Sequence, residues 1–256
     1  MSEKKIRYYK NYETDFFESG NDYKLPDDYK WVRNDVPSRI LSSVIYAAAL
    51  IFSNIYCRLF LHLKIVGAEK VRKAGKSGFF FYGNHTQPVG DVFNPALACF
   101  PKRIYTVVGA ANFAIPVIGK ILPFLGALPI SDTLHGMKEF NKAVERRIQD
   151  GHPVIIYPEA HVWEYYTDIR PFTSSSFKFP IKLECPVFCF TVTYQKRRFG
   201  KKPKSTLYVD GPFFAEGDSV KNKAEYLRDS VYLTMKERSK ASTYAYIVYK
   251  QKDEDR

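Results

Sequence analysis

The segment "YGNHTQPVGDVFNP", residues 82–95, places a histidine and a carboxylate close together after a short apolar run. His85 and Asp91 are six positions apart, and Pro88 and Gly90 lie between them. An aspartate at this distance can accept a hydrogen bond from one imidazole nitrogen, which fixes the tautomer and leaves the other nitrogen free to take a proton. The pair therefore predicts a general base that activates a hydroxyl group.

Two alternatives stay open on the spacing alone. A histidine and an aspartate in one loop also occur where they only stabilise that loop. If the pair is catalytic, direct transfer to an acceptor hydroxyl is favoured over a covalent serine route, because the sequence has no serine in a Gly-x-Ser-x-Gly context.

Three further segments follow the first in a recognisable order: "GALPISD", "GHPVIIYPEA" and "CPVFCFTVTY". With the first segment they resemble the glycerolipid acyltransferase family, also called lysophospholipid acyltransferases, over residues 58–214. That family's pattern is Asn-His-x4-Asp, Gly-x-x-Pro-x-x-Arg, Phe-Pro-Glu-Gly-Thr-Arg and a strand with Val-Pro. The segment "RPFTSSSFK" also resembles the family between its third and fourth blocks. The matching residues, block by block, are Asn84, His85 and Asp91, then Gly126 and Pro129, then Tyr157, Pro158 and Glu159, then Pro186.

The chain departs from the family pattern in three places. Five residues, rather than four, separate His85 from Asp91. Asp132 stands where the second block has its arginine, and the third block has "AHV", residues 160–162, in place of Gly-Thr-Arg. In the family those arginines are thought to hold the acceptor's phosphate, a task that suits the planar guanidinium fork. Their absence leaves two alternatives: Arg170 or Lys178 substitutes for them, or the acceptor is another lipid, such as a glycolipid.

The resemblance implies transfer of a fatty acyl group from a thioester, on coenzyme A or acyl carrier protein, to a hydroxyl of a lysophospholipid, glycerolipid or related lipid. His85 is then the general base and Asp91 orients it. The thioester is a co-substrate, and no other cofactor and no metal are expected. The remaining site residues that we expect at the substrate are Asn84, Pro158, Glu159, His161 and Arg170.

Two other functions remain as alternatives. In the first alternative, the chain is a lipid-binding relative that kept the fold without catalysis. The departures in the arginine blocks motivate it. Alternatively, it is a metal-dependent hydrolase in which His85, Asp91, Glu159 and His161 converge on one ion.

Alternating apolar segments and helical periodicity indicate the α/β class. Short apolar runs predict strands at 78–82 and 154–157 and within "CPVFCFTVTYQ" and "STLYVDGPFF". Helical spacing predicts helices in "TLHGMKEFNKAVERRIQDG" and "SVKNKAEYLRDSVYLTMKERSK". Residues 107–130 are apolar but rich in proline and glycine, so we expect broken helices there. The resemblance implies a glycerol-phosphate-acyltransferase-like sandwich, with a mixed central sheet flanked by helices.

The segment "ILSSVIYAAALIFSNIYC", residues 40–57, holds no charged residue and approaches the length that spans a bilayer. We expect it to lie in the membrane, spanning it or resting in its interface; the alternative is a buried amphipathic helix. The expected organisation is a polar arm at 1–38, the apolar membrane-associated helix at 39–63, the acyltransferase domain at 64–216, and a C-terminal helix and tail at 217–256 packed on that domain.

Net charge favours an anionic partner. The formal charge is +12, and "QKRRFGKKPK" packs six basic residues into ten, which suits anionic lipid headgroups. No nucleic-acid reader motif accompanies it, so nucleic acid is not an expected partner. Four cysteines without a paired spacing indicate a reducing compartment, and no secretory signal is seen. We therefore expect a peripheral or monotopic protein at the cytoplasmic face of a membrane, of open oligomeric state.

Overall fold

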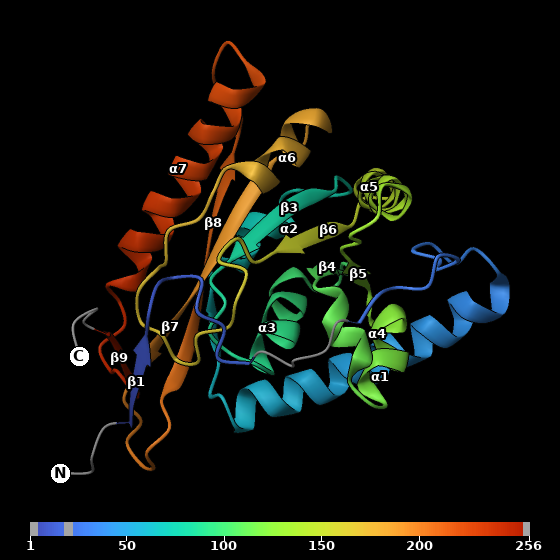
Figure 1. Ribbon diagram of the computed structural model, residues 1–256. Coiled ribbons are helices and arrows are strands. Elements are labelled where there is room, and N and C mark those ends of the chain that lie inside the picture. Colours follow the sequence, from blue (N-terminus) through green and yellow to red (C-terminus); the bar gives the residue numbers. More distant parts are fainter. Residues whose placement is uncertain (1–4, 18–22, 253–256) are drawn as a thin grey trace.

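A computed structural model describes residues 5–17 and 23–252 of the chain. Within them, one mixed sheet has the strand order β2-β8-β7-β3-β6-β4-β5, and a small second sheet pairs β1 with β9 (Figure 1). The strands are β1 (Lys5–Tyr9), β2 (Lys64–Val66), β3 (Phe79–Gly83), β4 (Tyr105–Val108), β5 (Ala127–Pro129), β6 (Pro153–Ile156), β7 (Val187–Gln195), β8 (Lys204–Phe213) and β9 (Ile247–Gln251). The helices are α1 (Val36–Leu59), α2 (Ala68–Arg72), α3 (Gly90–Cys99), η1 (Ala110–Ala114), α4 (Ile118–Leu125), α5 (Leu134–Gln149), η2 (Ser175–Phe177), α6 (Lys178–Lys182) and α7 (Val220–Ser239).

The topology brings the predicted catalytic segments to one edge of the sheet. β3 pairs in parallel with β6, in the register Phe79↔Pro153 to Tyr82↔Ile156. Only the β7–β8 pair is antiparallel among the described strands of this sheet. The residues that follow β3 and β6 therefore emerge side by side at the carboxyl edge, where open α/β sheets commonly bind ligands.

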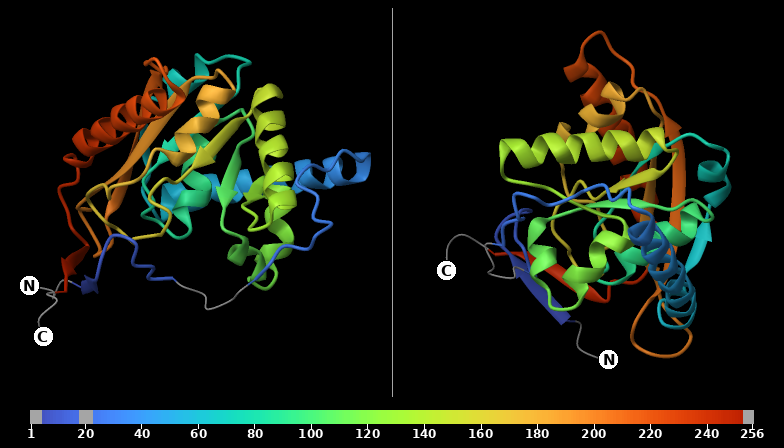
Figure 2. Two further views of the ribbon diagram at one scale, coloured as in Figure 1. Left: turned by 45° about the horizontal axis from the view of Figure 1, so that its top comes forward. Right: turned by 90° about the vertical axis from the view of Figure 1, so that its right-hand side faces the viewer.

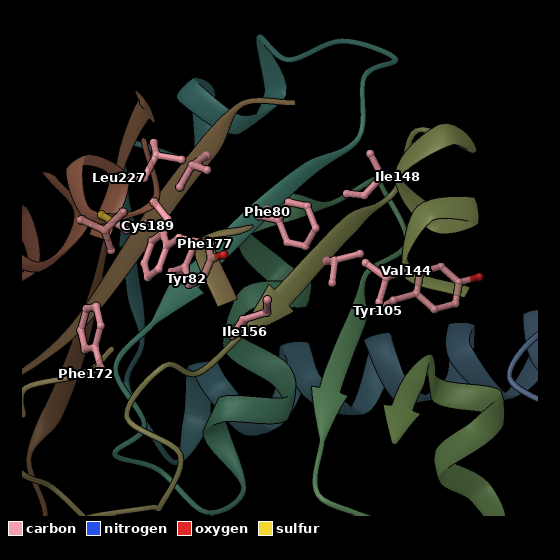
Figure 3. Packing of buried hydrophobic residues seen from close by; sticks show 14 of the residues in the cluster. Phe80, Tyr82, Tyr105, Val144, Ile148, Ile156, Phe172, Phe177, Cys189 and Leu227 are labelled. Carbon is pink, nitrogen blue, oxygen red and sulfur yellow. The ribbon is translucent and has the colours of Figure 1, made fainter. Parts of the chain in front are cut away.

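The central strands are buried on both faces, which explains why they read as continuous apolar runs. All five residues of β3 are buried. Phe80 and Tyr82 pack in the cluster that includes residues of α5 and α7 (Figure 3). Phe79 and Phe81 pack on the other face, with residues of α2 and α3. This double cover holds the sheet edge in one place and gives the site a rigid base.

Most predicted elements are confirmed, including the mixed α/β sheet. Residues 107–130 differ from the expected broken helices, because β4 and β5 lie at the two ends of the segment and only η1 and α4 are helical. Gly126 ends α4 with φ of 94°, a left-handed conformation that a glycine adopts readily and that turns the chain back into β5.

Both ends of the described chain are more ordered than the sequence indicates. The sequence analysis predicts no strand in either terminal segment, but β9 pairs in parallel with β1, and both strands lie at one end of the molecule (Figures 1 and 2). The arm after β1 packs three aromatic rings, Tyr9, Tyr12 and Phe16, against Trp163. Long-range aromatic burial of this kind leaves no periodic signal in either terminal segment.

The apolar helix α1 lies on the outside of the domain, against α3 and α4 (Figure 1). It begins at Val36, where the side chain of Asp35 accepts a hydrogen bond from the backbone of Ser38 at 2.9 Å. Only 11% of its most apolar 18-residue window is buried. The alternative of a buried helix is therefore wrong, and the helix is long and apolar enough to cross a membrane.

Asp210 joins three elements through one carboxylate. Its oxygens accept hydrogen bonds from Lys70 of α2 at 2.7 Å and from Arg238 of α7 at 2.7 and 2.9 Å. Burial opposes ionisation of this carboxyl, but the hydrogen bonds from Arg238 and Lys70 outweigh it and hold its pKa below the usual value. The ionised form therefore stabilises the fold.

Replacing Asp210 with Asn should lower the free energy of unfolding by about 2 kcal/mol at pH 7, because two charged donors lose an ionised acceptor. A depressed folded-state pKa contributes stability above the unfolded value of about 3.9 and loses it as the pH falls through the folded pKa. The difference between wild type and Asp210→Asn should therefore shrink below about pH 4. Chemical denaturation at several pH values measures it, with Asp229→Asn, a surface pair of Arg228, as a near-neutral control.

Candidate active site

The loop after β3 is anchored by Asn84. Its amide nitrogen donates to the carbonyl of Val192 at 3.0 Å, and its amide oxygen accepts from the backbone nitrogen of Val192 at 2.8 Å. The preceding Gly83 lets the ring of Phe190 approach, because an added Cβ would lie 2.0 Å from that ring. Asn84 is buried, and its polar atoms bind β7, so its predicted contact with substrate stays a prediction.

The structure brings His85 and Asp91 into direct contact. His85 Nδ1 and Asp91 Oδ2 are 2.7 Å apart, and the same oxygen accepts from the backbone nitrogen of Gln87 at 2.9 Å. The additional residue in this block forms part of a turn at 88–89, directly before α3 begins at Gly90. The longer spacing therefore still permits the contact, and Asp91 occupies the first turn of α3, where a negative charge is favourable.

Asp91 lies in surroundings that favour a charged partner. Its side chain is 2% exposed, and burial raises its pKa, an effect opposed by the hydrogen bond with His85. Asp91 Oδ1 has no hydrogen-bond partner among the described residues. A buried carboxylate with an unused oxygen stabilises positive charge strongly, so a proton gained by the imidazole is stabilised at this position.

Tyr157 covers one face of the imidazole. The two rings stack with centroids 4.3 Å apart and planes 17° from parallel, and the phenol donates to the backbone oxygen of Asp91. Burial raises the pKa of Tyr157 well above its ordinary value, so this phenol stays protonated and acts as a donor. Tyr157 is a site residue that the sequence analysis did not assign, although it stands directly before Pro158 in the third block. Pro158 itself is partly exposed beside it.

Glu159 joins the loop after β3 to the loop after β6. Its carboxylate accepts from the backbone nitrogen of His85 at 3.3 Å, from the backbone nitrogen of Arg170 at 3.0 Å and from the Arg170 guanidinium at 3.1 Å. The Arg170 and Glu159 side chains are 1% and 0% exposed. Neither group offers surface to a substrate in this arrangement, so their expected substrate contacts stay predictions, and the structure shows instead a buried pair that positions His85.

Arg170 also binds the N-terminal arm. Its guanidinium donates to the backbone oxygen of Tyr12 at 3.2 Å and to that of His161, and it lies 4.7 Å from the centroid of Trp163. The predicted role of Arg170 as a replacement for the family's phosphate-binding arginine stays a prediction: these contacts use its two terminal nitrogens, and Nε has no hydrogen-bond partner among the described residues.

His161 contacts the N-terminal arm. Its Nδ1 lies 3.1 Å from Asp15 Oδ2 on the arm, and its side chain is about one-third exposed. Within residues 5–17 and 23–252, no group of three or more histidine, cysteine or acidic side chains is arranged to hold a metal ion. The four side chains required by the hydrolase alternative therefore do not converge.

A buried polar chain supports the loop from behind. Gln87 donates to Ser205 Oγ at 2.8 Å and accepts from the amide of Asn94 at 3.0 Å. Cys57 of α1 in turn donates its thiol to Asn94 at 3.4 Å. The exposed apolar helix and the His85 loop are thus connected through three side chains.

These contacts leave one reactive group facing outward. His85 has 21% of its side chain exposed, its Nδ1 is held by Asp91, and its ring is stacked on Tyr157. The remaining nitrogen, Nε2, is the atom that can accept a proton from a bound hydroxyl. The contacts of the ring with Asp91 and Tyr157 therefore set the direction of this nitrogen.

Comparisons with known proteins agree on the type of fold. The family model described as Acyltransferase matches residues 62–193. The structure is similar to the crystal structure of the 1-acyl-sn-glycerophosphate (LPA) acyltransferase PlsC from Thermotoga maritima, with 16% sequence identity and a TM-score of 0.56. That similarity covers 84% of this chain and 86% of the PlsC chain. No curated protein gives a significant match.

Breaking the Glu159–Arg170 pair should destabilise the fold, because one charge remains buried and uncompensated. We expect Glu159→Gln and Arg170→Met each to lower the free energy of unfolding by about 3 kcal/mol, and the double variant to cost less than the sum. Denaturant unfolding of the four proteins gives the coupling energy. The exposed pair Glu139–Lys142 provides the matched control, for which coupling of at most about 0.5 kcal/mol is expected. Additive costs at Glu159 and Arg170 would contradict the proposed pairing.

Proposed function

This chain belongs to the acyltransferase family, and on that premise we propose that it transfers a fatty acyl group from a thioester to a hydroxyl of a lysophospholipid, glycerolipid or related lipid. The observation that carries the proposal is the 2.7 Å contact between His85 and Asp91, with His85 partly exposed at the carboxyl edge of the sheet. The acyl donor is acyl-CoA or acylated carrier protein, used as a co-substrate.

The reaction follows from the two nitrogens of His85. Nε2 takes the proton of the acceptor hydroxyl while the hydroxyl oxygen attacks the thioester carbonyl carbon. Asp91 stabilises the resulting imidazolium through Nδ1. The tetrahedral intermediate then collapses, the carbon–sulfur bond breaks, and the imidazolium returns the proton to the leaving thiolate. The products are an ester and a free thiol, and His85 regains its neutral form.

We propose a lipid hydroxyl as the acceptor, which is a broader class of compound than the acceptor named for PlsC. That enzyme is described as acting on 1-acyl-sn-glycerophosphate. In this chain Asp132 and Val162 replace the two arginines of the family pattern, and Arg170 is buried against Glu159. The proposed acceptor is therefore one whose recognition does not depend on a phosphate contact at those three positions.

We place the protein on a membrane, at its cytoplasmic face, as a monotopic or peripheral enzyme. Large apolar side chains are exposed along α1, and others are exposed at the start of α3 and α4, which both contact α1. The exposed residues are Val36, Ile40, Leu41, Val44, Ile51, Phe52, Ile55 and Leu59 on α1, with Val89, Val92, Val117 and Ile118 nearby. A continuous lipid-facing surface would deliver acyl chains close to His85, and the four free cysteines suit a reducing compartment.

Replacing His85 with Ala should lower the rate of acyl transfer by about a thousandfold, because the general base is lost. The assay supplies acyl-CoA with a panel of lysolipid and glycolipid acceptors and follows release of free thiol, and thermal unfolding verifies that the variant folds. His135→Ala, on the exposed surface of α5, is the control and should keep the wild-type rate. Equal rates for His85→Ala and wild type would refute the mechanism, while a wild type inactive with every acceptor would favour the non-catalytic lipid-binding alternative.

Polar substitutions on α1 should release the protein from membranes. We expect Ile51→Gln with Ile55→Gln to weaken partitioning into phosphatidylcholine vesicles at least about tenfold, because two apolar side chains no longer enter the bilayer. The control, Val220→Gln with Leu233→Gln, makes the same type of change at comparably exposed positions of α7. Vesicle flotation measures both, and equal losses in the two variants would argue against a membrane-bound α1.

A further inference from the structure

A hollow lies away from His85, between the first turns of α1, the helix α4 and the end of α5. It is a cavity of about 610 Å³, and its floor includes Tyr105, at the start of β4, and His152, directly before β6. Tyr105 and His152 lie at the amino ends of β4 and β6, whereas His85 and Glu159 follow the carboxyl ends of β3 and β6. Because β4 and β6 run parallel to β3, the hollow and the catalytic edge lie at opposite edges of the sheet.

The hollow is strongly cationic. Five arginines line it: Arg33, Arg39, Arg103, Arg146 and Arg147. Asp150 is the one carboxylate among its described lining residues. Asp150 Oδ2 lies 3.0 Å from Arg146 Nε and 3.9 Å from Arg147 Nη1, so one negative charge is shared by two guanidinium groups. Five positive charges against one negative charge leave a net charge of four, with His152 neutral.

Two of these guanidinium groups are held close together with unused donors. Arg147 and Arg103 lie 4.3 and 5.5 Å from the centroid of the Tyr105 ring. The Nε atoms of both are buried and have no hydrogen-bond partner among the described residues. Burial lowers the pKa of Arg147, and the charge of Arg103 lowers it further. Buried like charges with unpaired donors are costly unless an anion compensates them.

We infer that this cavity binds the phosphate group of an anionic phospholipid. Guanidinium forks match phosphate oxygens in geometry and charge, and the cluster supplies several forks around one hollow. Asp150 alone leaves a net charge of four, and a singly or doubly charged phosphate would lower it to three or two. No acyl transfer is involved, and the site is separate from the one proposed around His85.

The position of the cavity indicates a lipid rather than a soluble ligand. Ser38, Arg39, Ser42 and Ser43 of α1 line it, and the same two turns expose Val36, Ile40, Leu41 and Val44. The first turns of α1 extend beyond the sheet toward one side of the molecule (Figure 2). A helix that places apolar side chains in the bilayer would therefore hold the arginine cluster at the depth of the headgroups.

The test compares two double variants of the full chain without any acyl donor, so that its outcome is independent of acyl transfer. Arg39→Gln with Arg146→Gln removes two exposed charges from the cavity, and Lys221→Gln with Lys223→Gln removes two from the start of α7, far from α1 (Figure 1). Flotation with phosphatidylcholine vesicles, with and without phosphatidylglycerol, measures the gain in binding due to the anionic lipid. Thermal unfolding without ligand verifies that both variants fold.

We expect the cavity variant to lose about thirtyfold of the gain from phosphatidylglycerol, at about 1 kcal/mol for each basic residue near the surface, and the α7 variant to keep most of it. Equal losses in the two variants would indicate non-specific charge attraction and overturn the site. Inorganic pyrophosphate provides the second arm. A rise in the wild-type melting temperature with pyrophosphate that the cavity variant lacks, combined with no gain from phosphatidylglycerol, would overturn the lipid assignment in favour of a soluble phosphate compound.

Discussion

The carboxylate of Glu159 connects the two loops from which the site is built. It receives a backbone hydrogen bond from His85 after β3 and two hydrogen bonds from Arg170 in the loop after β6. Because both side chains are buried, the pair tolerates little displacement. The hydrogen bond from the backbone of His85 to Glu159 therefore restricts the position of the imidazole as well. The orientation of His85 toward Asp91 depends on this connection as much as on the 2.7 Å contact itself.

The N-terminal arm takes part in the same network. Tyr12 accepts from Arg170 through its backbone oxygen, and Thr14 accepts from the indole of Trp163 at 2.8 Å. A segment far away in sequence thus contacts the charged pair that holds the backbone of His85. The arm also holds His161, whose Nδ1 contacts Asp15. In this chain, residues that follow the third block contact the N-terminal arm and each other.

Positive charge and apolar surface occupy different places on the molecule and meet at the first turns of α1. The sheet separates the arginine-lined hollow, near the amino ends of β4 and β6, from the catalytic edge at the carboxyl ends. Exposed apolar side chains of α1 pass beside both regions, since α1 contacts α3 at the catalytic side and α4 at the other. One helix can therefore fix both regions relative to a lipid surface.

The sequence by itself determined the local elements and singled out the pair that we propose as catalytic. Apolar runs predicted β3 and β6, helical spacing predicted α5 and α7, and the first block singled out His85 and Asp91, because strand, helix and loop preferences depend on nearby residues. Only the tertiary structure decided which polar groups are buried. The Glu159–Arg170 pair, the ring of Tyr157 on His85, the pairing of β1 with β9 and the arginine-lined hollow all join residues distant in sequence. Such contacts depend on how the chain packs, and packing leaves no periodic trace in one sequence.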